Sequence, residues 1–518
     1  ERTYEKALMG QRGIEYWLRD NKNRPTQRFE NGESDTMAVA GSNLYSSIDI
    51  ELQELGEKLL KNKIGSVVAI DPQTGGILAM VSGPGYKPSL LTGASRSKHI
   101  NEMYNDPRLP LLNRAVSASY SPGSTFKTLQ ALIGLQEGVI TTDFKVSCSG
   151  AFYGCGTGKP MKCLDFGTFD LRGAITKSDN TYFATVMQRV INNTAYPNVD
   201  SSLNVWAKYM RAFGLGHVLG VDIPAEKPGL LPDAAYYNKR YGQGKWNYCT
   251  FRSVSIGQGE VDVTPLQVAN EMAYIANKGW YITPHVIDSI QGGDQFALLE
   301  KYKAKHTSVT IDESVFEAVH DGMQGVMESG TGRSAKIDGI VVCGKTGTVE
   351  NYYRGVKQKN HSFFAAFAPR KNPKIAIMCV VENAGFGTTY AAPIVSLMIE
   401  KYIKGKITDK GRLAKIEQLE KTTLIPAKIY LEYKRQDSIR HMKDTGYLIQ
   451  KGYLKMIKDT MDLEDEPEVE LRNEKDSLKK VIPPLKKKPA NNNITDRPAM
   501  INVDDKRKPQ LHKKKSTI

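Results

Sequence analysis

The pattern of hydrophobic positions divides the chain into a structured body and two polar ends. Between about residue 44 and residue 405, apolar side chains recur at helical or strand spacing. The stretch "LYSSIDIELQELGEKLL" places four leucines on one helix face, with Ser47 or Asp49 as the candidate N-cap. In the stretch that follows, "GSVVAIDPQTGGILAMVSG", β-rich runs at 67–71 and 77–82 flank a turn that contains proline and glycine. This pattern predicts a β-hairpin.

Strand patterns return near the end of the same body. "GIVVCGKTGTVEN" predicts a strand at Ile340–Cys343 that enters a tight glycine-rich segment, and "HSFFAAFAPRKNPKIAIMCVVE" predicts two more strands around the turn "RKNPK". The region from about 101 to 330 reads as helical segments and long loops. Strands at both ends with helices between them predict an α+β fold, in which one antiparallel sheet is covered by helices.

The two ends differ from the body in composition. Residues 1–43 are interrupted by "NKNRPTQRFENGES" and are expected to be the end of an upstream domain with its linker. The body at 44–405 is the main domain. Residues 406–518 form a C-terminal extension, expected to be helical over parts of 411–465. Its last segment is expected to be disordered, because it is rich in charge and poor in apolar residues.

Charge and hydropathy set limits on the class of protein. The formal net charge is +15. From Leu471 to Ile518 there are 14 Lys/Arg and 5 Asp/Glu, a net +9 that leaves only +6 for the rest. No aromatic-basic pattern accompanies this tail, so no nucleic-acid partner is expected. No stretch reaches the roughly 20 apolar residues that span a membrane. Because the chain starts at Glu1 inside a helix-like pattern, we expect a fragment.

The first candidate for chemistry is "SPGSTFKTLQ", in which Ser124 precedes Lys127 by three residues. At this spacing the two side chains share one face of a helix, so Lys127 could reach back to the Ser124 hydroxyl. The same S-x-x-K pattern also occurs at Ser95 and at Ser477 in polar or basic surroundings. Alone, the pattern therefore indicates no more than a helix N-cap followed by a surface lysine.

Two further motifs follow along the chain. "KSDNTYF" offers the Ser178 hydroxyl and the Asn180 amide two residues apart, although alone it would be an Asx-type turn or a helix cap. "GKTGT" offers the Lys345 charge, the hydroxyls of Thr346 and Thr348, and in Gly347 a residue that lets a ligand backbone approach closely. Alone, it would be a hairpin turn.

The order of the three motifs is far more specific than any one of them. S-x-N follows S-x-x-K by 54 residues, and K-T-G follows after another 167. The chain therefore resembles the penicillin-recognising serine acyltransferases, that is, penicillin-binding proteins and serine β-lactamases. The segment "SIGQGEVDVTPLQVANEMAYIANKG" is similar to penicillin-binding transpeptidases, and residues 361–394 most resemble the elongation-type class B group, penicillin-binding protein 2. The resemblance covers roughly residues 1–405.

The resemblance implies a peptidoglycan D,D-transpeptidase, and it implies a role for each residue of the motifs. Ser124 would attack the D-Ala–D-Ala amide of a stem peptide and form an acyl-enzyme. Lys127, kept neutral by its surroundings, would accept the proton. Ser178 would relay a proton to the leaving amine, and Asn180 would hold the substrate amide. The terminal carboxylate would be bound by Lys345, Thr346 and Thr348, and Gly347 would belong to the same substrate-binding segment. The oxyanion hole would be formed by the backbone N–H groups of Ser124 and Thr348.

The resemblance also implies a cellular setting. It implies a bacterial inner-membrane protein whose catalytic domain lies in the periplasm and cross-links peptidoglycan during side-wall elongation. The membrane anchor and most of an N-terminal pedestal domain would lie upstream of Glu1, and residues 1–43 would be the end of that pedestal domain with its linker. The implied partners are peptidoglycan stem peptides and a SEDS-family glycosyltransferase of the elongation complex, with β-lactam antibiotics as covalent inhibitors. No cofactor is required for this chemistry.

Two alternatives within the superfamily stay open at this stage. A class A β-lactamase would add a glutamate in E-x-x-L-N, and "DSSLN" at 200–204 keeps that spacing with an aspartate. Its position along the chain is poor for that fold, so Asp200 or Ser201 is expected to cap a helix instead. A non-catalytic β-lactam sensor would need a signalling domain, and the sequence shows none.

The cysteines offer a possible metal site. Cys148, Cys155 and Cys163 lie close together in sequence and could bind a structural Zn²⁺ with Asp165 as fourth ligand. Some elongation-type relatives are thought to carry a metal in this region with a histidine ligand, where this chain has Phe166. A disulfide is the main competing interpretation, and the spacing does not choose between them. Cys343 and Cys379 lie in strand-like runs and are expected to pack as small apolar groups.

Overall fold

The computed structural model describes residues 2–156, 160–163, 165–292, 297–307, 311–353, 356–443 and 448. The chain divides into a compact unit at Glu1–Gln436 and a second unit at Asp437–Ile518. Across the described ranges, none of the helices has both the length and the apolar composition that a bilayer crossing requires. The tail for which disorder is expected lies outside the described residues.

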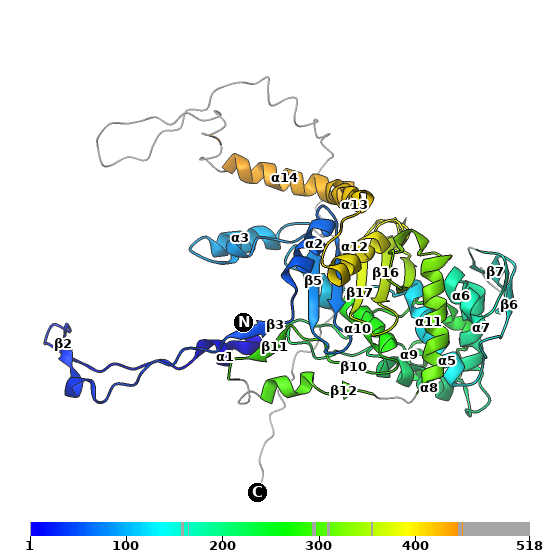
Figure 1. Ribbon diagram of the computed structural model, residues 1–518, viewed down its shortest axis with the longest axis horizontal. Coiled ribbons are helices and arrows are strands. Elements are labelled where there is room, and N and C mark those ends of the chain that lie inside the picture. Colours follow the sequence, from blue (N-terminus) through cyan, green and yellow to red (C-terminus); the bar gives the residue numbers. More distant parts are fainter. Residues whose placement is uncertain are drawn as a thin grey trace, which may run out of the picture. The chain divides into compact units, whose positions relative to one another are not determined.

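A five-stranded antiparallel sheet forms the centre of the first unit (Figure 1). Its strands in spatial order are β13 (Cys343–Val349), β16 (His361–Ala368), β17 (Ile375–Val381), β4 (Gly65–Ile70) and β5 (Ile77–Gly83). β17 is buried at every position, which explains why its sequence "IAIMCVV" shows no alternation of polar and apolar residues. The predicted β4–β5 hairpin and the two strands around "RKNPK" are confirmed.

The edge strand β13 differs from the expectation. The sequence predicted a strand at Ile340–Cys343 that enters a tight glycine-rich segment. In the structure the strand runs from Cys343 to Val349 and contains the whole K-T-G-T motif. Each of its residues has a partner in β16, with Lys345 opposite Ala365 and Gly347 opposite Phe363. A side chain at Gly347 would lie 2.9 Å from the Phe363 Cβ, so only glycine lets the two strands pair here. Pairing with the long apolar strand β16 outweighs the weak strand preference of two glycines.

Helices cover both faces of the sheet. The Ser362 hydroxyl accepts a hydrogen bond from Ala391 N at the start of α12 (Ala391–Lys404). Phe363, the next residue of β16, contacts the ring of Tyr120 on the opposite face. α2 (Ile50–Leu60) packs beside α12, and its predicted cap is Asp49, whose carboxylate accepts from Leu52 N at 3.0 Å. The opposite face carries α10 (Pro265–Ala276) and α11 (Glu313–Glu328).

A helical lobe beside the sheet carries the first two motifs. Its main helices are α5 (Lys127–Gln136), α6 (Leu171–Lys177), α7 (Asn180–Ile191) and α8 (Val199–Ala212). The remaining helices and 3-10 turns of the body are η3 (Pro88–Leu91), α3 (Arg96–Tyr104), α4 (Arg114–Ser117), η4 (Gly123–Phe126), α9 (Ala234–Tyr241), η5 (Tyr248–Thr250), η6 (Arg252–Ile256), η8 (Ala297–Tyr302) and η9 (Arg333–Ala335). The short strands of the body are β6 (Val146–Cys148), β7 (Ala151–Phe152), β8 (Met161–Lys162), β9 (Gly167–Phe169), β10 (Tyr281–Ile282), β11 (Ile287–Ile290), β12 (Lys305–His306), β14 (Tyr352–Tyr353) and β15 (Val356–Lys357).

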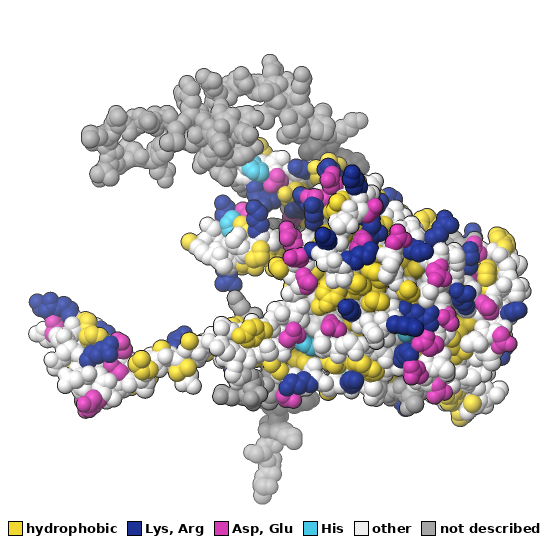
Figure 2. Space-filling model, in the orientation of Figure 1, with side chains coloured by type: hydrophobic (Ala, Val, Ile, Leu, Met, Phe, Trp, Pro, Cys, Tyr) yellow, Lys and Arg dark blue, Asp and Glu magenta, His cyan; other side chains and the backbone are white. Residues whose placement is uncertain are grey.

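The N-terminal segment forms an arm of short elements. These are η1 (Arg2–Tyr4), α1 (Glu5–Met9), β1 (Trp17–Arg19), β2 (Pro25–Arg28), η2 (Phe29–Gly32) and β3 (Leu44–Ser46). The arm exposes apolar side chains, among them Ile14, Trp17 and Val39 (Figure 2). It is joined to the body where the Tyr4 hydroxyl donates to the buried Asp222 carboxylate at 2.6 Å and where β3 pairs with β11.

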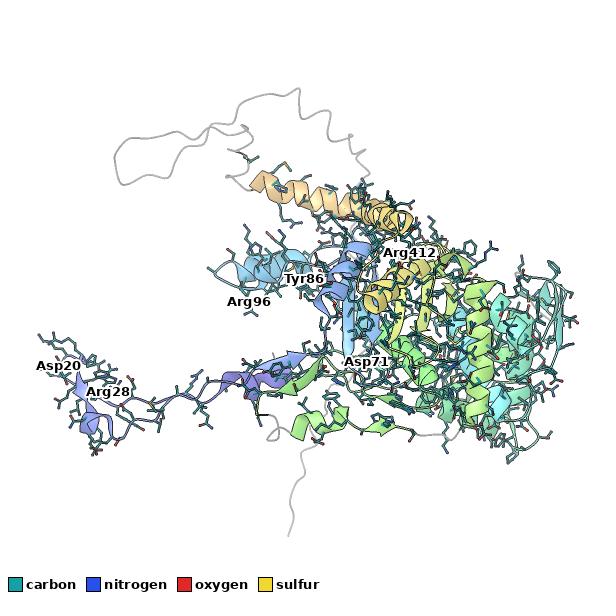
Figure 3. The ribbon with its side chains drawn as sticks, in the orientation of Figure 1. Asp20, Arg28, Asp71, Tyr86, Arg96 and Arg412 are labelled. Atoms are coloured by element: carbon teal, nitrogen blue, oxygen red, sulfur yellow. A yellow bond between two sulfur atoms is a disulfide. The ribbon has the colours of Figure 1, made fainter. Side chains whose placement is uncertain are left out.

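The start of the C-terminal extension is packed on the body. α13 (Lys410–Lys421) lies against α2, and the fully buried Lys63 ammonium donates to the backbone oxygen of Leu419 near its end. Arg412, labelled in Figure 3, reaches from α13 to Glu400 and Ser396 of α12. α14 (Ala427–Lys443) follows. Helices were expected in this stretch. The domain boundaries at 43 and 405 stay a prediction.

Candidate active site

Ser124 lies in the first turn of the helix that leads into α5. The turn η4 begins at Gly123, whose φ of +58° is in the left-handed region. A side chain at Gly123 would lie 3.2 Å from Val349 Cγ2 and 3.4 Å from the Thr348 oxygen, so glycine lets this turn approach β13 closely. Ser124 is half-buried and sits beside the edge strand. Backbone N–H groups in a first helical turn have no partner within the helix and can bind an anion.

Lys127 is fully buried one turn after Ser124. Its Nζ donates to the Ser178 backbone oxygen at 2.7 Å and to Asn180 Oδ1 at 2.6 Å, and it lies 3.3 Å from Ser178 Oγ. Burial lowers the pKa of Lys127 to about 7, although the negative charge of Asp179 acts in the opposite direction. The S-x-x-K and S-x-N motifs are therefore in direct contact. No hydrogen bond joins Lys127 Nζ to Ser124 Oγ in the part of the chain that the structure describes.

The conformation of Ser178 explains how S-x-N reaches this lysine. Ser178 ends α6 in the left-handed region, at φ +60°, and Asp179 then caps α7 by accepting from Tyr182 N at 2.6 Å. The chain reverses between two helices at one residue, which points both the oxygen and the hydroxyl of Ser178 toward Lys127. Asn180 is fixed from its other end, because its Nδ2 donates to the Lys162 backbone oxygen at 2.6 Å.

Lys345 approaches the same serine from β13. Its Nζ donates to Ser178 Oγ at 2.8 Å and to the Thr346 backbone oxygen at 3.2 Å. Burial and the neighbouring charge of Lys127 hold the pKa of Lys345 well below its ordinary value. Three motifs that are 54 and 167 residues apart in sequence thus converge on one hydroxyl.

The next residues of β13 line the edge of the sheet beside the cluster. The Thr346 hydroxyl lies 2.6 Å from the hydroxyl of Thr331, in the turn after α11. A side chain built at Gly347 would lie 3.4 Å from the Pro122 oxygen, which places the strand against the Ser124 turn. Thr348 is half-buried and lies beside Gly123. Hydroxyls, a lysine and the backbone N–H groups of a first helical turn are therefore gathered in one place, where they suit the binding and acylation of a carboxylate-bearing substrate.

Comparison with known proteins agrees with this geometry. A family model described as the penicillin-binding protein transpeptidase domain matches residues 65–400, a range that holds all three motifs. The chain belongs to this family. The peptidoglycan D,D-transpeptidase MrdA of Acinetobacter baumannii is 33% identical over 405 residues, which are 76% of this chain and 58% of the relative. The chain thus spans about three fifths of the length of that relative.

Solved structures of this family are similar to the chain. Penicillin-binding protein 2 of Pseudomonas aeruginosa, in complex with WCK 5153, is 31% identical, with a TM-score of 0.63 over 72% of this chain and 79% of that one. Penicillin-binding protein 2 of Helicobacter pylori, in complex with MreC, is 25% identical, with a TM-score of 0.66 over 78% and 72%. The predicted fold and the predicted penicillin-binding protein 2 type are confirmed.

The cysteine site of the transpeptidase domain needs a correction. Cys155 forms a disulfide with Cys249, 94 residues away, so it cannot serve as a thiolate ligand with Cys148 and Cys163. Asp165 is not part of the group that could hold a metal ion among the described residues; Asp179 stands in its place. Sequence spacing could not reveal this, because Asp179 belongs to a distant turn that only the fold brings next to the cysteines.

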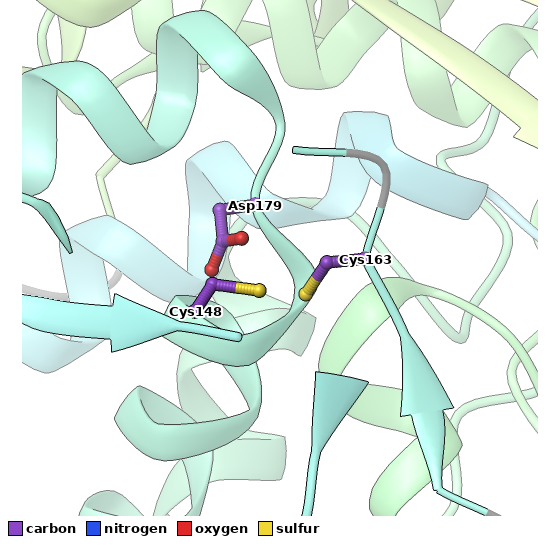
Figure 4. A group of neighbouring side chains, drawn as sticks. All are labelled: Cys148, Cys163 and Asp179. Carbon is purple, nitrogen blue, oxygen red and sulfur yellow. The ribbon is translucent and has the colours of Figure 1, made fainter. Parts of the chain in front are cut away.

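The corrected donor set fits a metal ion. The ligand atoms of Cys148, Cys163 and Asp179 lie within 4.8 Å of one another (Figure 4). Among the described residues, one oxygen of the Asp179 carboxylate, Oδ2, is buried without a hydrogen-bond partner, although the other oxygen caps α7. Burial raises the pKa of Cys163 to about 12, so the protein alone keeps this thiol protonated. Two sulfurs and one unpaired carboxylate oxygen are a donor set that suits Zn²⁺.

The competing patterns lie apart from the site. Ser95, the residue before α3, and Lys98 on α3 are exposed, and Ser477 lies outside the described residues. In "DSSLN", the cap of α8 is Asn198 and not Asp200 or Ser201, and Asp200 accepts from the Asn238 side chain at 2.7 Å. Over the ranges that the structure describes, no carboxylate is hydrogen-bonded to Ser124 or Lys127.

One contact of the site was missed by the sequence reasoning. The hydroxyl of Thr331 lies beside that of Thr346, and no pattern in the sequence could have revealed this contact.

Proposed function

We propose that the chain is the catalytic part of a peptidoglycan D,D-transpeptidase, with Ser124 as the nucleophile. The observation that carries the proposal is the cluster in which Lys127 and Lys345 both contact Ser178 while Ser124 lies one turn from Lys127. The relatives named as D,D-transpeptidases support the same reaction. The substrate would be a stem peptide that ends in D-Ala–D-Ala.

The reaction would proceed in two halves. Ser124 Oγ attacks the D-Ala–D-Ala carbonyl, and its proton passes to neutral Lys127. Lys127 and Ser178, 3.3 Å apart, return a proton to the leaving nitrogen, so that D-alanine departs and the acyl-enzyme remains. In the second half an amine of another stem peptide attacks the ester, gives up its proton along the same path and releases Ser124.

Binding and charge stabilisation would be shared among the other residues. Lys345, Thr346 and Thr348 would hold the terminal carboxylate of the substrate, and Asn180 would hold an amide of its backbone. The N–H groups of Ser124 and Thr348 would stabilise the negative oxygen of the tetrahedral intermediate. β-Lactams would acylate Ser124 in the same way and stay bound. A β-lactamase is the less favoured function, because among the described residues no carboxylate is hydrogen-bonded to Ser124 or Lys127, and Asp200 of "DSSLN" is bound by Asn238 instead.

The cellular setting is part of the same proposal. The relatives act in peptidoglycan synthesis, and penicillin-binding protein 2 of Helicobacter pylori was solved with MreC. We place this catalytic domain in the periplasm of a bacterium, attached to the inner membrane. Its expected partners are a SEDS-family glycosyltransferase and an elongation complex. The disulfide between Cys155 and Cys249 supports an oxidising compartment.

A structural Zn²⁺ held by Cys148, Cys163 and Asp179 completes the proposal. When bound, the ion would tie the hairpin of β7 and β8 to the turn that carries Ser178, and it would take no part in the chemistry. Metal analysis of the purified protein should find about one zinc per chain, and Cys148→Ser should lose it. A protein that is folded and contains no zinc would contradict this part.

The function is tested by labelling with a fluorescent penicillin. The wild-type protein should be labelled covalently, and Ser124→Ala should not be labelled. Ser95→Ala is the matched control, because it removes the serine of a second S-x-x-K pattern and should leave labelling intact. Absence of label on the wild type would overturn the proposal. Rapid turnover of the label, together with hydrolysis of a chromogenic cephalosporin, would favour a β-lactamase.

A further inference from the structure

The loop after η6 contacts both segments that would form the oxyanion hole. The Gly257 backbone oxygen accepts from Gly123 N at 2.8 Å, next to the nucleophile. The side chain of the following residue, Gln258, donates from Nε2 to the Thr348 backbone oxygen at 3.3 Å. Two adjacent residues of one loop therefore hold the Ser124 turn on one side and the K-T-G-T strand on the other.

The contact with the Ser124 turn leaves little freedom. Gly257 has a φ of +69°, and a side chain there would lie 2.2 Å from the Gly123 oxygen and 2.8 Å from the Phe126 Cβ. The loop is therefore pressed against the Gly123 backbone before Ser124 and against the Phe126 side chain after it. A few residues further on, Val263 exchanges two backbone hydrogen bonds with Tyr120, at 2.8 and 2.9 Å, which fixes the start of the same turn.

The contact with Thr348 determines where the N–H group of this residue points. In an antiparallel pair, each residue directs its N–H and C=O groups to the same side, either toward the partner strand or away from it. Among the described strands, β13 lies at the edge of the sheet and pairs with β16 alone. Because the Thr348 oxygen is bound by Gln258 from the open side, the Thr348 N–H also faces the open side. That is the side on which Gly123 and Ser124 lie.

We propose that Gln258 is a positioning residue that sets the separation of the two oxyanion-hole N–H groups, those of Ser124 and Thr348. This inference rests on the proposed function. The loop itself is anchored to the Ser124 turn through Gly257, so the Gln258 amide fixes the edge strand relative to that turn. Gln258 acts through the Thr348 backbone and has no contact with the reacting atoms.

A residue in this role has a kinetic signature that general stabilisation does not share. Loss of alignment weakens the tetrahedral states in acylation and deacylation alike, while the reversible binding that precedes acylation depends on other contacts. Displacement of a catalytic group by about 1 Å can cost about 100-fold in rate. The Gln258→Met variant, which keeps the side-chain length and lacks the donor, should therefore acylate roughly 10- to 100-fold more slowly.

The test measures acylation by a chromogenic cephalosporin in rapid-mixing experiments, separating the limiting rate from the dissociation constant. For Gln258→Met we expect a lower limiting rate, a similarly slower deacylation, a dissociation constant within about twofold of wild type and an unchanged melting temperature. A boronic acid, which forms a tetrahedral adduct with the serine, should bind more weakly by a similar factor. The matched control is Gln73→Met, which removes an exposed glutamine donor to Asn277 and should behave as wild type.

A second variant adds a pH readout. In Gln258→Glu the ionised carboxylate faces the Thr348 oxygen and cannot donate, whereas the protonated acid can. Its acylation rate relative to wild type at the same pH should therefore rise as the pH falls through about 4 to 5. Equal limiting rates for wild type and Gln258→Met would overturn the inference while the proposed function stands. Failure of the wild type to form any acyl-enzyme would overturn both.

Discussion

Replacing Asn180 with aspartate tests whether Lys127 is the base. Asn180 Oδ1 lies 2.6 Å from Lys127 Nζ, so Asn180→Asp puts a negative charge against the amine with little change in shape. An opposite charge within about 4 to 6 Å favours the charged form and shifts a pKa by about 1 to 3 units. The pKa of Lys127 should therefore rise from about 7 to between about 8 and 10.

The effect on acylation follows from the fraction of neutral amine. At pH 7 a lysine with a pKa of about 7 is half neutral, whereas one with a pKa of about 8 to 10 is neutral in about 1 of 10 to 1 of 1,000 molecules. If neutral Lys127 accepts the Ser124 proton, Asn180→Asp should move the rise of the acylation rate to higher pH by 1 to 3 units. At pH 7 the rate should fall about 10- to 1,000-fold below the plateau of the same variant.

The assay is the second-order rate constant for a fluorescent penicillin between about pH 5.5 and about pH 11, one unit above the highest expected midpoint, with each protein compared to its own plateau. The exposed Asn105→Asp adds the same charge away from the site and should keep the wild-type midpoint. The reasoning is refuted if the wild-type rate is flat through pH 7, or if the midpoint for Asn180→Asp stays in place or moves to lower pH. Either result would assign the base to another group.

Three further predictions concern stability and the edge strand. Replacing Cys155 and Cys249 with serine should lower the free energy of unfolding by about 2 to 4 kcal/mol in denaturant titrations, because the disulfide closes a long loop; unchanged stability would contradict this. Burial raises the pKa of Glu271 to about 8, because the buried carboxyl is more stable protonated than charged. Its contribution to the free energy of unfolding is therefore greatest below about pH 4.5 and is lost as the pH rises through about 8. Glu271→Gln should therefore be more stable than wild type at pH 9 by about 1 to 3 kcal/mol, with the difference shrinking toward pH 5. Gly347→Ala should cut acylation at least about tenfold by pushing β13 from Phe363, and normal labelling would show that the strand adapts.

Most of the fold could be predicted from the sequence, because in most elements the local pattern of residues agrees with the tertiary contacts. The Asp49 cap, the β4–β5 hairpin and the apolar run of β17 are each readable from neighbouring residues. The edge strand was predicted too early in the chain. Glycine and lysine have weak strand preferences, and only the partner β16, which follows later in the sequence, makes K-T-G-T a strand.

The candidate active site could also be predicted in part, and its contacts could not. The motif residues could be identified from spacing, but the contact of Lys127 with Ser178 depends on one left-handed residue between two helices. Nothing in "KSDNTYF" distinguishes that conformation from an ordinary helix cap. The supporting contacts of Gln258 and Thr331 join segments 90 and 15 residues apart, and neither pair has a local pattern.

The two buried lysines are best understood as one titrating pair. Ser178 Oγ lies 3.3 Å from the Nζ of Lys127 and 2.8 Å from that of Lys345, and both amines are fully buried. Two ammonium groups this close in a low dielectric oppose each other, so the loss of one proton belongs to the pair. A substrate carboxylate bound to Lys345 would hold the proton there and offset its charge. That offset raises the proton affinity of Lys127 at the step in which it must accept the Ser124 proton, so binding of the proper substrate would itself improve the base.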